Sequence, residues 1–107
     1  MSMSSEDRAI LRDFSLAVRG RFPEALIWAY GSRARGTARE DSDLDVCVVV
    51  ENLDTETDRA IMRTAWEVGF ERDVLISTVT YSREEFEHGP CAISPLVRTV
   101  VEEGIVA

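Results

Sequence analysis

Two aspartates, Asp43 and Asp45, are separated by one residue at the start of an apolar run that ends at Val50. If the run is a β-strand, alternate side chains share a face, so the two Cα atoms lie roughly 6 to 7 Å apart with both carboxylates on one side. Two such charges repel each other unless cations lie between them. Divalent ions held by the pair would neutralise a triphosphate, align an attacking oxygen and stabilise leaving pyrophosphate. The pair therefore indicates the metal half of a phosphoryl- or nucleotidyl-transfer site.

Gly31 and Ser32 follow a second apolar run, which ends at Tyr30 and is typical of a buried strand. A glycine lets the backbone approach a ligand, and consecutive amides beside a hydroxyl bind phosphate oxygens. An isolated Gly-Ser pair is equally typical of an ordinary turn, so its interpretation depends on the aspartates downstream. Arg33 leaves two alternatives open: hydrogen bonds to a phosphate, or an ion pair with the acidic residues at 40 and 41.

Asp73 stands at the start of the β-branched run that ends at Tyr81, which predicts a third strand over residues 73–81. If that strand neighbours the one that carries Asp43 and Asp45, three carboxylates surround the reacting atom. The third would hold metal and accept the proton of an acceptor hydroxyl as a general base. The alternative is a polar residue at the beginning of a strand.

The spacing of Asp41, Asp43 and Asp45 also resembles the start of an EF-hand calcium loop. That loop requires Gly at its sixth position and a bidentate Glu at its twelfth, and the chain has Val46 and Asn52 there. A hydrophobic strand also follows at the point where the loop should continue. The sequence therefore excludes this calcium site.

Capping residues and hydrophobic spacing predict the elements that position these side chains. Helices are expected to begin near Ser4, Thr55, Ser82 and Ser94, and strands cover residues 25–30, 43–50 and 73–81, with a loop or short helix over 31–42. A chain of 107 residues is long enough for one compact domain and too short for two. We therefore expect a single α/β domain over residues 1–107, with a small sheet covered by helices.

Composition limits the classes of partner. The formal net charge is -8, which disfavours nonspecific binding to nucleic acid. Cys47 and Cys91 lack paired spacing, so neither a disulfide framework nor a zinc site is predicted. No apolar run approaches the length of a membrane span, and no signal-peptide pattern is present at the N-terminus. We expect a soluble, cytoplasmic protein without membrane contact.

The segment GSRARGTAREDSDLDVCVVV, residues 31–50, resembles the signature of the minimal nucleotidyltransferases, a branch of the DNA polymerase beta-like superfamily. The segment from Ser94 to Ile105 resembles the C-terminal part of the same family. The resemblance implies an α+β fold with a small mixed sheet covered by helices. It also implies that Gly31 and Ser32 bind the phosphates of ATP, that Asp43 and Asp45 hold two Mg²⁺ ions, and that Asp73 matches the third carboxylate.

Members of this family act as the antitoxin half of a toxin–antitoxin pair with a HEPN-type partner. The resemblance implies transfer of AMP from ATP to a tyrosine of that partner. Two alternatives remain: a noncatalytic nucleotide-binding antitoxin that acts by occlusion, and transfer to a small molecule such as an aminoglycoside. Since 107 residues leave no evident acceptor-binding domain, a partner or a second copy of the chain is expected to complete the cleft.

Overall fold

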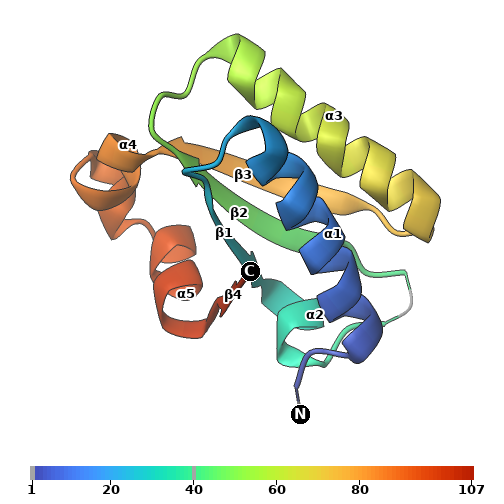
Figure 1. Ribbon diagram of the computed structural model, residues 1–107. Helices are drawn as coiled ribbons and strands as arrows, with labels where there is room; N and C mark the ends of the chain where they lie inside the picture. The colour runs from blue at the N-terminus through green and yellow to red at the C-terminus, as the bar shows by residue number, and fades with distance from the viewer. Residues whose placement is uncertain (1, 40) are drawn as a thin grey trace.

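A computed structural model describes residues 2–39 and 41–107, which contain a four-stranded mixed sheet (Figure 1). The strands are β1 (Leu26–Tyr30), β2 (Leu44–Val50), β3 (Ile76–Ser82) and β4 (Ile105–Val106), in the spatial order β3-β2-β1-β4. β2 is antiparallel to β1 and parallel to β3, and β4 is antiparallel to β1. This mixed sheet, flanked by helices, confirms the predicted fold class.

The two long helices, α1 (Ser5–Arg21) and α3 (Thr55–Arg72), lie side by side on one face of the sheet (Figure 1). α1 begins where predicted, because the side chain of Ser4 accepts a hydrogen bond from the Asp7 amide at 3.0 Å. α3 is capped by Asp54, which accepts from the Thr57 amide at 2.7 Å. The N-cap is therefore Asp54, one residue before the predicted Thr55.

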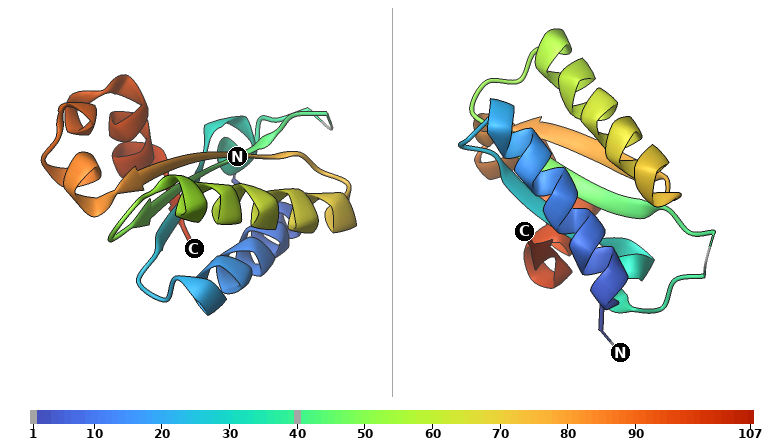
Figure 2. Two further views of the ribbon diagram at one scale, coloured as in Figure 1. Left: turned by 90° about the horizontal axis from the view of Figure 1, so that it is seen from above. Right: turned by 45° about the vertical axis from the view of Figure 1, so that its right-hand side comes forward.

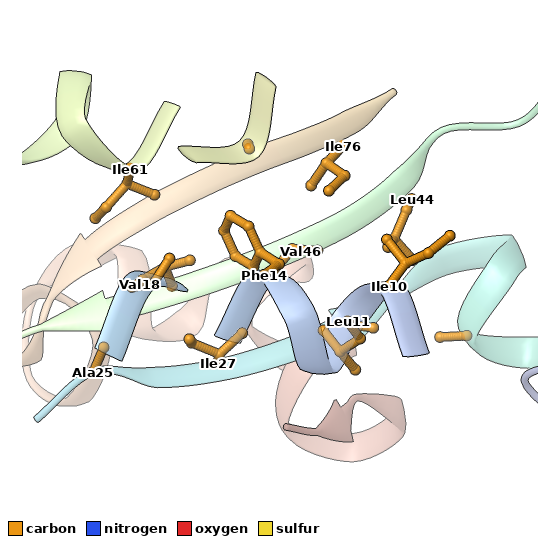
Figure 3. Close-up of a cluster of buried hydrophobic side chains, with 14 of the residues drawn as sticks. Ile10, Leu11, Phe14, Val18, Ala25, Ile27, Leu44, Val46, Ile61 and Ile76 are labelled. Carbon is orange, nitrogen blue, oxygen red and sulfur yellow. The ribbon is translucent and has the colours of Figure 1, made fainter. Parts of the chain in front are cut away.

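The main hydrophobic core fills the space between these helices and the sheet (Figure 3). α1 contributes Phe14, which is 0% exposed, together with Ile10, Leu11 and Val18. β2 contributes every second residue: Leu44, Val46, Val48 and Val50. The period of two fixes which face of β2 points to the core, because a slip of one residue would turn all four side chains away from it.

The opposite face of the sheet is covered by the shorter C-terminal helices, α4 (Arg83–Glu87), the 3-10 turn Pro90–Ile93 and α5 (Pro95–Glu103) (Figure 2). Cys47 and Val49 of β2 pack here against Val100 of α5. The rings of Trp28 and Phe86 stack with centroids 5.2 Å apart, which assigns Trp28 to packing rather than to a nucleotide base. Tyr30, at the end of β1, also packs against this second core.

Two boundaries differ from the expectation. β3 begins at Ile76 and not at Asp73, and β2 begins at Leu44. β4 was not predicted, because a two-residue strand at the edge of a sheet is too short to give a periodic signal. Within residues 2–39 and 41–107, no helix is long and apolar enough to cross a membrane.

Candidate active site

The row of side chains at the N-terminal end of β2 defines the candidate site. Asp45 is the second residue of β2, and its register partners are Tyr30 on antiparallel β1 and Ser77 on parallel β3. Neighbours in register point to the same face, and this is the face of Cys47, opposite the main core. Ser77 is exposed and Tyr30 and Asp45 are partly buried, so the row is open to a ligand.

Asp43 lies just before β2 and close enough to Asp45 to affect its ionisation. Burial raises the pKa of the Asp45 carboxyl, and the charge of Asp43 raises it further. The pKa of Tyr30 is raised to about 12, mainly by burial and then by the charges of Asp45 and Cys47. The structure thus brings the two predicted aspartates together, at a place where negative charge is destabilised and a cation would relieve it.

Gly31 lies directly against the Asp45 carboxylate. It is the first residue of the short helix α2 (Gly31–Arg35), and its φ is +79°, in the left-handed region that glycine occupies without strain. A Cβ at this position would lie 2.7 Å from Asp45 Oδ2. Because residue 31 has no side chain, the backbone of Gly31 and Ser32 can lie beside the Asp45 carboxylate.

Arg33 lies inside the molecule, in contact with two other segments. Its Nε donates to the Ser42 carbonyl at 2.6 Å, and a terminal nitrogen is 2.8 Å from Asp7 Oδ1 of α1. The two side chains are only 14% and 10% exposed. Of the two alternatives for Arg33, the structure contains an ion pair, and its partner is Asp7; of the residues first considered, Glu40 lies outside the described residues.

The Arg33 contacts join the two halves of the site. Ser42 immediately precedes Asp43, and Arg33 lies in the same helix as Gly31 and Ser32. One guanidinium therefore fixes the phosphate-side helix α2, the segment that leads to Asp43, and the N-terminal turn of α1 relative to one another. We could not infer this from the sequence, because it depends on α1 and α2 lying next to each other.

Asp73 is not on β3. It is the residue after the end of α3, with φ 57° and ψ 44°, a left-handed conformation that Asp adopts more readily than most residues. Its side chain is exposed, and the β3 residue in register with Asp45 is Ser77. Across residues 2–39 and 41–107, no three His, Cys, Asp or Glu side chains form a group that could hold a metal ion. The structure therefore does not bring Asp73 into a metal-binding group with Asp43 and Asp45.

Tyr30 and Ser77 were missed as members of the site. Tyr30 precedes Gly31, so its place on β1 was visible, but its pairing with Asp45 depends on the register of two strands. Ser77 was hidden by the misplaced start of β3. Cys47, on the same face of β2, is 0% exposed, and burial raises the pKa of its thiol to about 12, which keeps it unreactive.

The donor set suits a hard divalent cation. Asp43 and Asp45 offer carboxylate oxygens, and Mg²⁺ is commonly bound by one or two carboxylates, with substrate phosphates and waters completing its ligands. Burial first, and then the charge of Asp43, raises the pKa of Asp45, so the ionised pair is destabilised here and a bound cation would offset that cost. Two carboxylates thus fit Mg²⁺ that arrives with a triphosphate better than a cation held by protein ligands alone.

The chain is similar to known nucleotidyltransferase domains and to two solved toxin–antitoxin structures. The sequence profile of the nucleotidyltransferase domain family matches residues 11–107. Two similar solved structures are an MntA–HpeT toxin–antitoxin mutant with two Asp-to-Glu changes, at 20% identity and TM-score 0.62, and a toxin–antitoxin with AMP-PNP, at 21% and 0.61. Each alignment covers 96% of this chain and 72% of the other, and at such identity it shows the shared fold. No curated protein matches the chain.

Proposed function

Because the chain belongs to the nucleotidyltransferase domain family, we propose that it transfers AMP from Mg-ATP to an acceptor hydroxyl, a tyrosine of a HEPN-type partner toxin. The observation that carries the proposal is the contact between Gly31 and the carboxylate of Asp45, next to Asp43. It puts a phosphate-binding backbone and a cation-binding pair at one point. The similar toxin–antitoxin structure with AMP-PNP supports ATP as the nucleotide and a toxin as the partner.

Each residue of the site has a part in this reaction. The backbone of Gly31 and the hydroxyl of Ser32 bind and orient the triphosphate beside the two aspartates. Asp43 and Asp45 would hold Mg²⁺, which would neutralise charge on the triphosphate and on the leaving pyrophosphate. Arg33 keeps the phosphate side and the metal side in register through Asp7 and Ser42. The acceptor oxygen bonds to the α-phosphorus, the bond from that phosphorus to the β-phosphate oxygen breaks, and the acceptor proton leaves.

The acceptor side of the site is the part that this chain does not supply. Ser77 lies where a third carboxylate would stand beside Asp45, and a serine hydroxyl is a poor general base at neutral pH. The partner is therefore expected to bring both its tyrosine and the groups that take up the tyrosine proton. A partner requirement of this kind agrees with a toxin–antitoxin role.

The test uses the HEPN-type protein that this proposal requires beside the chain. The two proteins are incubated with ATP and Mg²⁺, and intact-mass analysis of the partner is expected to show the addition of one or more AMP units. The same mixture with the Asp43→Ala and Asp45→Ala double variant is the control and should leave the partner mass unchanged. If no AMP is added while an authentic adenylyltransferase modifies its own substrate under the same conditions, the proposal is wrong.

A second candidate function is a noncatalytic antitoxin that acts by occlusion. The observation that favours it is that, among the described residues, Asp43 and Asp45 belong to no group of three acidic, His or Cys side chains that could hold a metal ion. In this case the site binds nucleotide without turnover. Neutralisation of the toxin by the Asp43→Ala and Asp45→Ala double variant in a stable complex would favour occlusion, whereas binding without neutralisation would favour modification. Transfer to a small molecule has no observation in its favour.

A further inference from the structure

The outer side of α3 carries an apolar surface that the chain itself does not cover. Met62, Trp66 and Phe70 follow one another at intervals of four residues, and Leu75 lies beside them just before β3. The four residues are 54%, 64%, 75% and 61% exposed, and the rings of Trp66 and Phe70 stack with centroids 5.4 Å apart. A groove of about 560 Å³ lies beside Trp66, Phe70 and Leu75, between the C-terminal half of α3 and residues 73–76.

The area of this surface is large for a chain of this size. From the exposed fractions, the four side chains present on the order of 500 Å² to solvent, which is at the upper end for a patch on a monomer. A stable protein–protein interface of standard size needs about 800 Å² from each partner. The four residues thus provide more than half of that area, and their polar neighbours can provide the rest.

The charged residues next to this surface follow the same four-residue interval. Arg59, Arg63, Glu67 and Glu71 form a line along α3, two positive charges and then two negative ones. All four are exposed, and within residues 2–39 and 41–107 none of them is in an ion pair of the chain itself. Their charges are therefore available to a partner.

The line of charged residues and the line of apolar residues on α3 have almost the same centre. Arg63 and Glu67 are equally distant from residue 65, and so are Arg59 and Glu71. Met62 and Phe70 are equally distant from Trp66. The centres of the two lines are therefore one residue apart, which is only about 1.5 Å along a helix. When two copies of a helix pack antiparallel about a two-fold axis, matching flanks meet on the same side, so each Arg of one copy would face a Glu of the other.

We propose that a second copy of this chain binds here, with the two α3 helices antiparallel and Trp66 near the two-fold axis. In this dimer Trp66 packs on Trp66, Met62 packs on Phe70, and the ion pairs Arg63–Glu67 and Arg59–Glu71 each form twice. α3 covers the face of the sheet opposite the one that carries Asp45, as Figures 1 and 2 show for the helix layers, so the dimer leaves both nucleotide sites accessible. The inference does not depend on the proposed function.

Sedimentation velocity of the purified chain over a concentration series tests the apolar part of the interface. The wild type is expected to sediment as a dimer, with twice the 12.0 kDa chain mass, at micromolar concentration. Leu75→Ser should weaken the dimer, and the matched control Leu16→Ser, which changes an equally exposed leucine (67%) on α1, should not. Circular dichroism confirms that both variants are folded.

Charge exchange tests the symmetry itself. Glu67→Arg alone places Arg63 of each copy opposite a new positive charge, and Arg63→Glu alone places two negative charges together, so each should raise the dissociation constant roughly tenfold or more. A chain with both changes restores opposite charges and should dimerise like the wild type. A mixture of the two single variants should form a heterodimer in preference to either homodimer.

Three results would overturn the proposal. They are a wild type that is monomeric at hundreds of micromolar, a dimer that Leu75→Ser and Trp66→Ala leave unchanged, and single charge variants that the double exchange does not rescue. A monomeric chain that binds the added toxin partner, and loses that binding on Trp66→Ala, would assign the surface to that partner instead.

Discussion

The two faces of β2 differ in a way that separates folding from chemistry. On one face, Leu44, Val46, Val48 and Val50 are all fully buried under α1 and α3. On the other, Cys47 and Val49 are buried under α5, but Asp45 at the near end is only partly covered. The helices cover one face completely and stop short on the other.

This difference explains how so short a chain can carry a charged site. The buried face fixes the register of β2, because every second residue must point to the core. The register then fixes Asp45 beside Tyr30 and Ser77, with Gly31 against its carboxylate. The destabilising charge is thus confined to one end of one face of β2, and burial of the rest of the strand offsets its cost.

The largest expected effect comes from removing the charge of Asp45, on the face of β2 that the helices leave partly uncovered. Asp45→Asn keeps the shape of the side chain and removes its ability to hold a cation, so the initial rate of AMP transfer should fall at least about a thousandfold. Asp41→Asn, which changes an exposed acid four residues away, is the control and should stay within about threefold of wild type by the same reasoning. Residual activity of the Asp45 variant within tenfold of wild type would remove Asp45 from the site.

The next effect concerns the Arg33 contacts, which join the two halves of the site to each other and to α1. Arg33→Met leaves the nearly buried Asp7 without its cation and should lower the free energy of unfolding by about 2 to 4 kcal/mol. Arg72→Met breaks the ion pair with Asp13, which also ties α1 to a second helix but is far more exposed, and should cost less than about 1 kcal/mol. Urea unfolding measures both. Equal losses would contradict a special role for the Arg33 contact.

A smaller effect is expected from Gly31→Ala. An alanine is strained at the φ of residue 31, and its Cβ displaces the Asp45 carboxylate. The free energy of unfolding should therefore fall by about 1 to 3 kcal/mol, and ATP affinity should fall with it. Gly20→Ala in α1 is the matched control: a Cβ there meets nothing within 4 Å, and the change should be neutral or stabilising by up to about 1 kcal/mol. Thermal unfolding and ATP titration would separate the two. If both substitutions behave alike, the backbone at Gly31 is not constrained.

The smallest effect is a dependence of stability on pH. The pKa of Asp45 is higher in the folded chain than its ordinary value of 3.8, so the folded state holds the proton longer. The contribution of Asp45 to stability is therefore largest at low pH, and it falls as the pH rises from the pKa of Asp45 in the unfolded chain through its higher pKa in the folded chain. With metal chelated, the free energy of unfolding is measured for the wild type and for Asp45→Asn from about pH 3 to about pH 7. The wild type should become less stable relative to the variant as the pH rises. A difference of the opposite sign would mean that Asp45 is stabilised in its charged form.

Much of the fold was visible in local patterns. The alternation in β2, the apolar run of β1 and the caps at Ser4 and Ser94 each depend on neighbouring residues, and the elements formed where predicted within a few residues. The proximity of Asp43 and Asp45 followed from strand periodicity alone. The nearness of Gly31 to Asp45 needed the resemblance to a family, because β1 and β2 are separated by thirteen residues.

What was missed depends on tertiary contacts or on an uncommon helix end. α3 extends to Arg72 and ends at Asp73 in a left-handed conformation without a glycine, so the β-branched run after it was assigned to a strand too early. Arg33 could not be paired with Asp7 from sequence, because the two residues are 26 positions apart. The exposure of Trp66 and Phe70 was equally hidden, since a helix shows its apolar positions but not which of them meet the sheet.

The most direct test of the central claim is the binding of ATP, which needs no acceptor. Isothermal titration of the wild type with ATP should show binding with Mg²⁺ or Mn²⁺ present and little or none with the cation chelated. The Asp43→Asn and Asp45→Asn double variant should lose the cation-dependent part while its circular dichroism spectrum stays unchanged. Binding of ATP that is equally tight in the double variant, or indifferent to the cation, would contradict the claim that the two aspartates and the Gly31–Ser32 turn form one site.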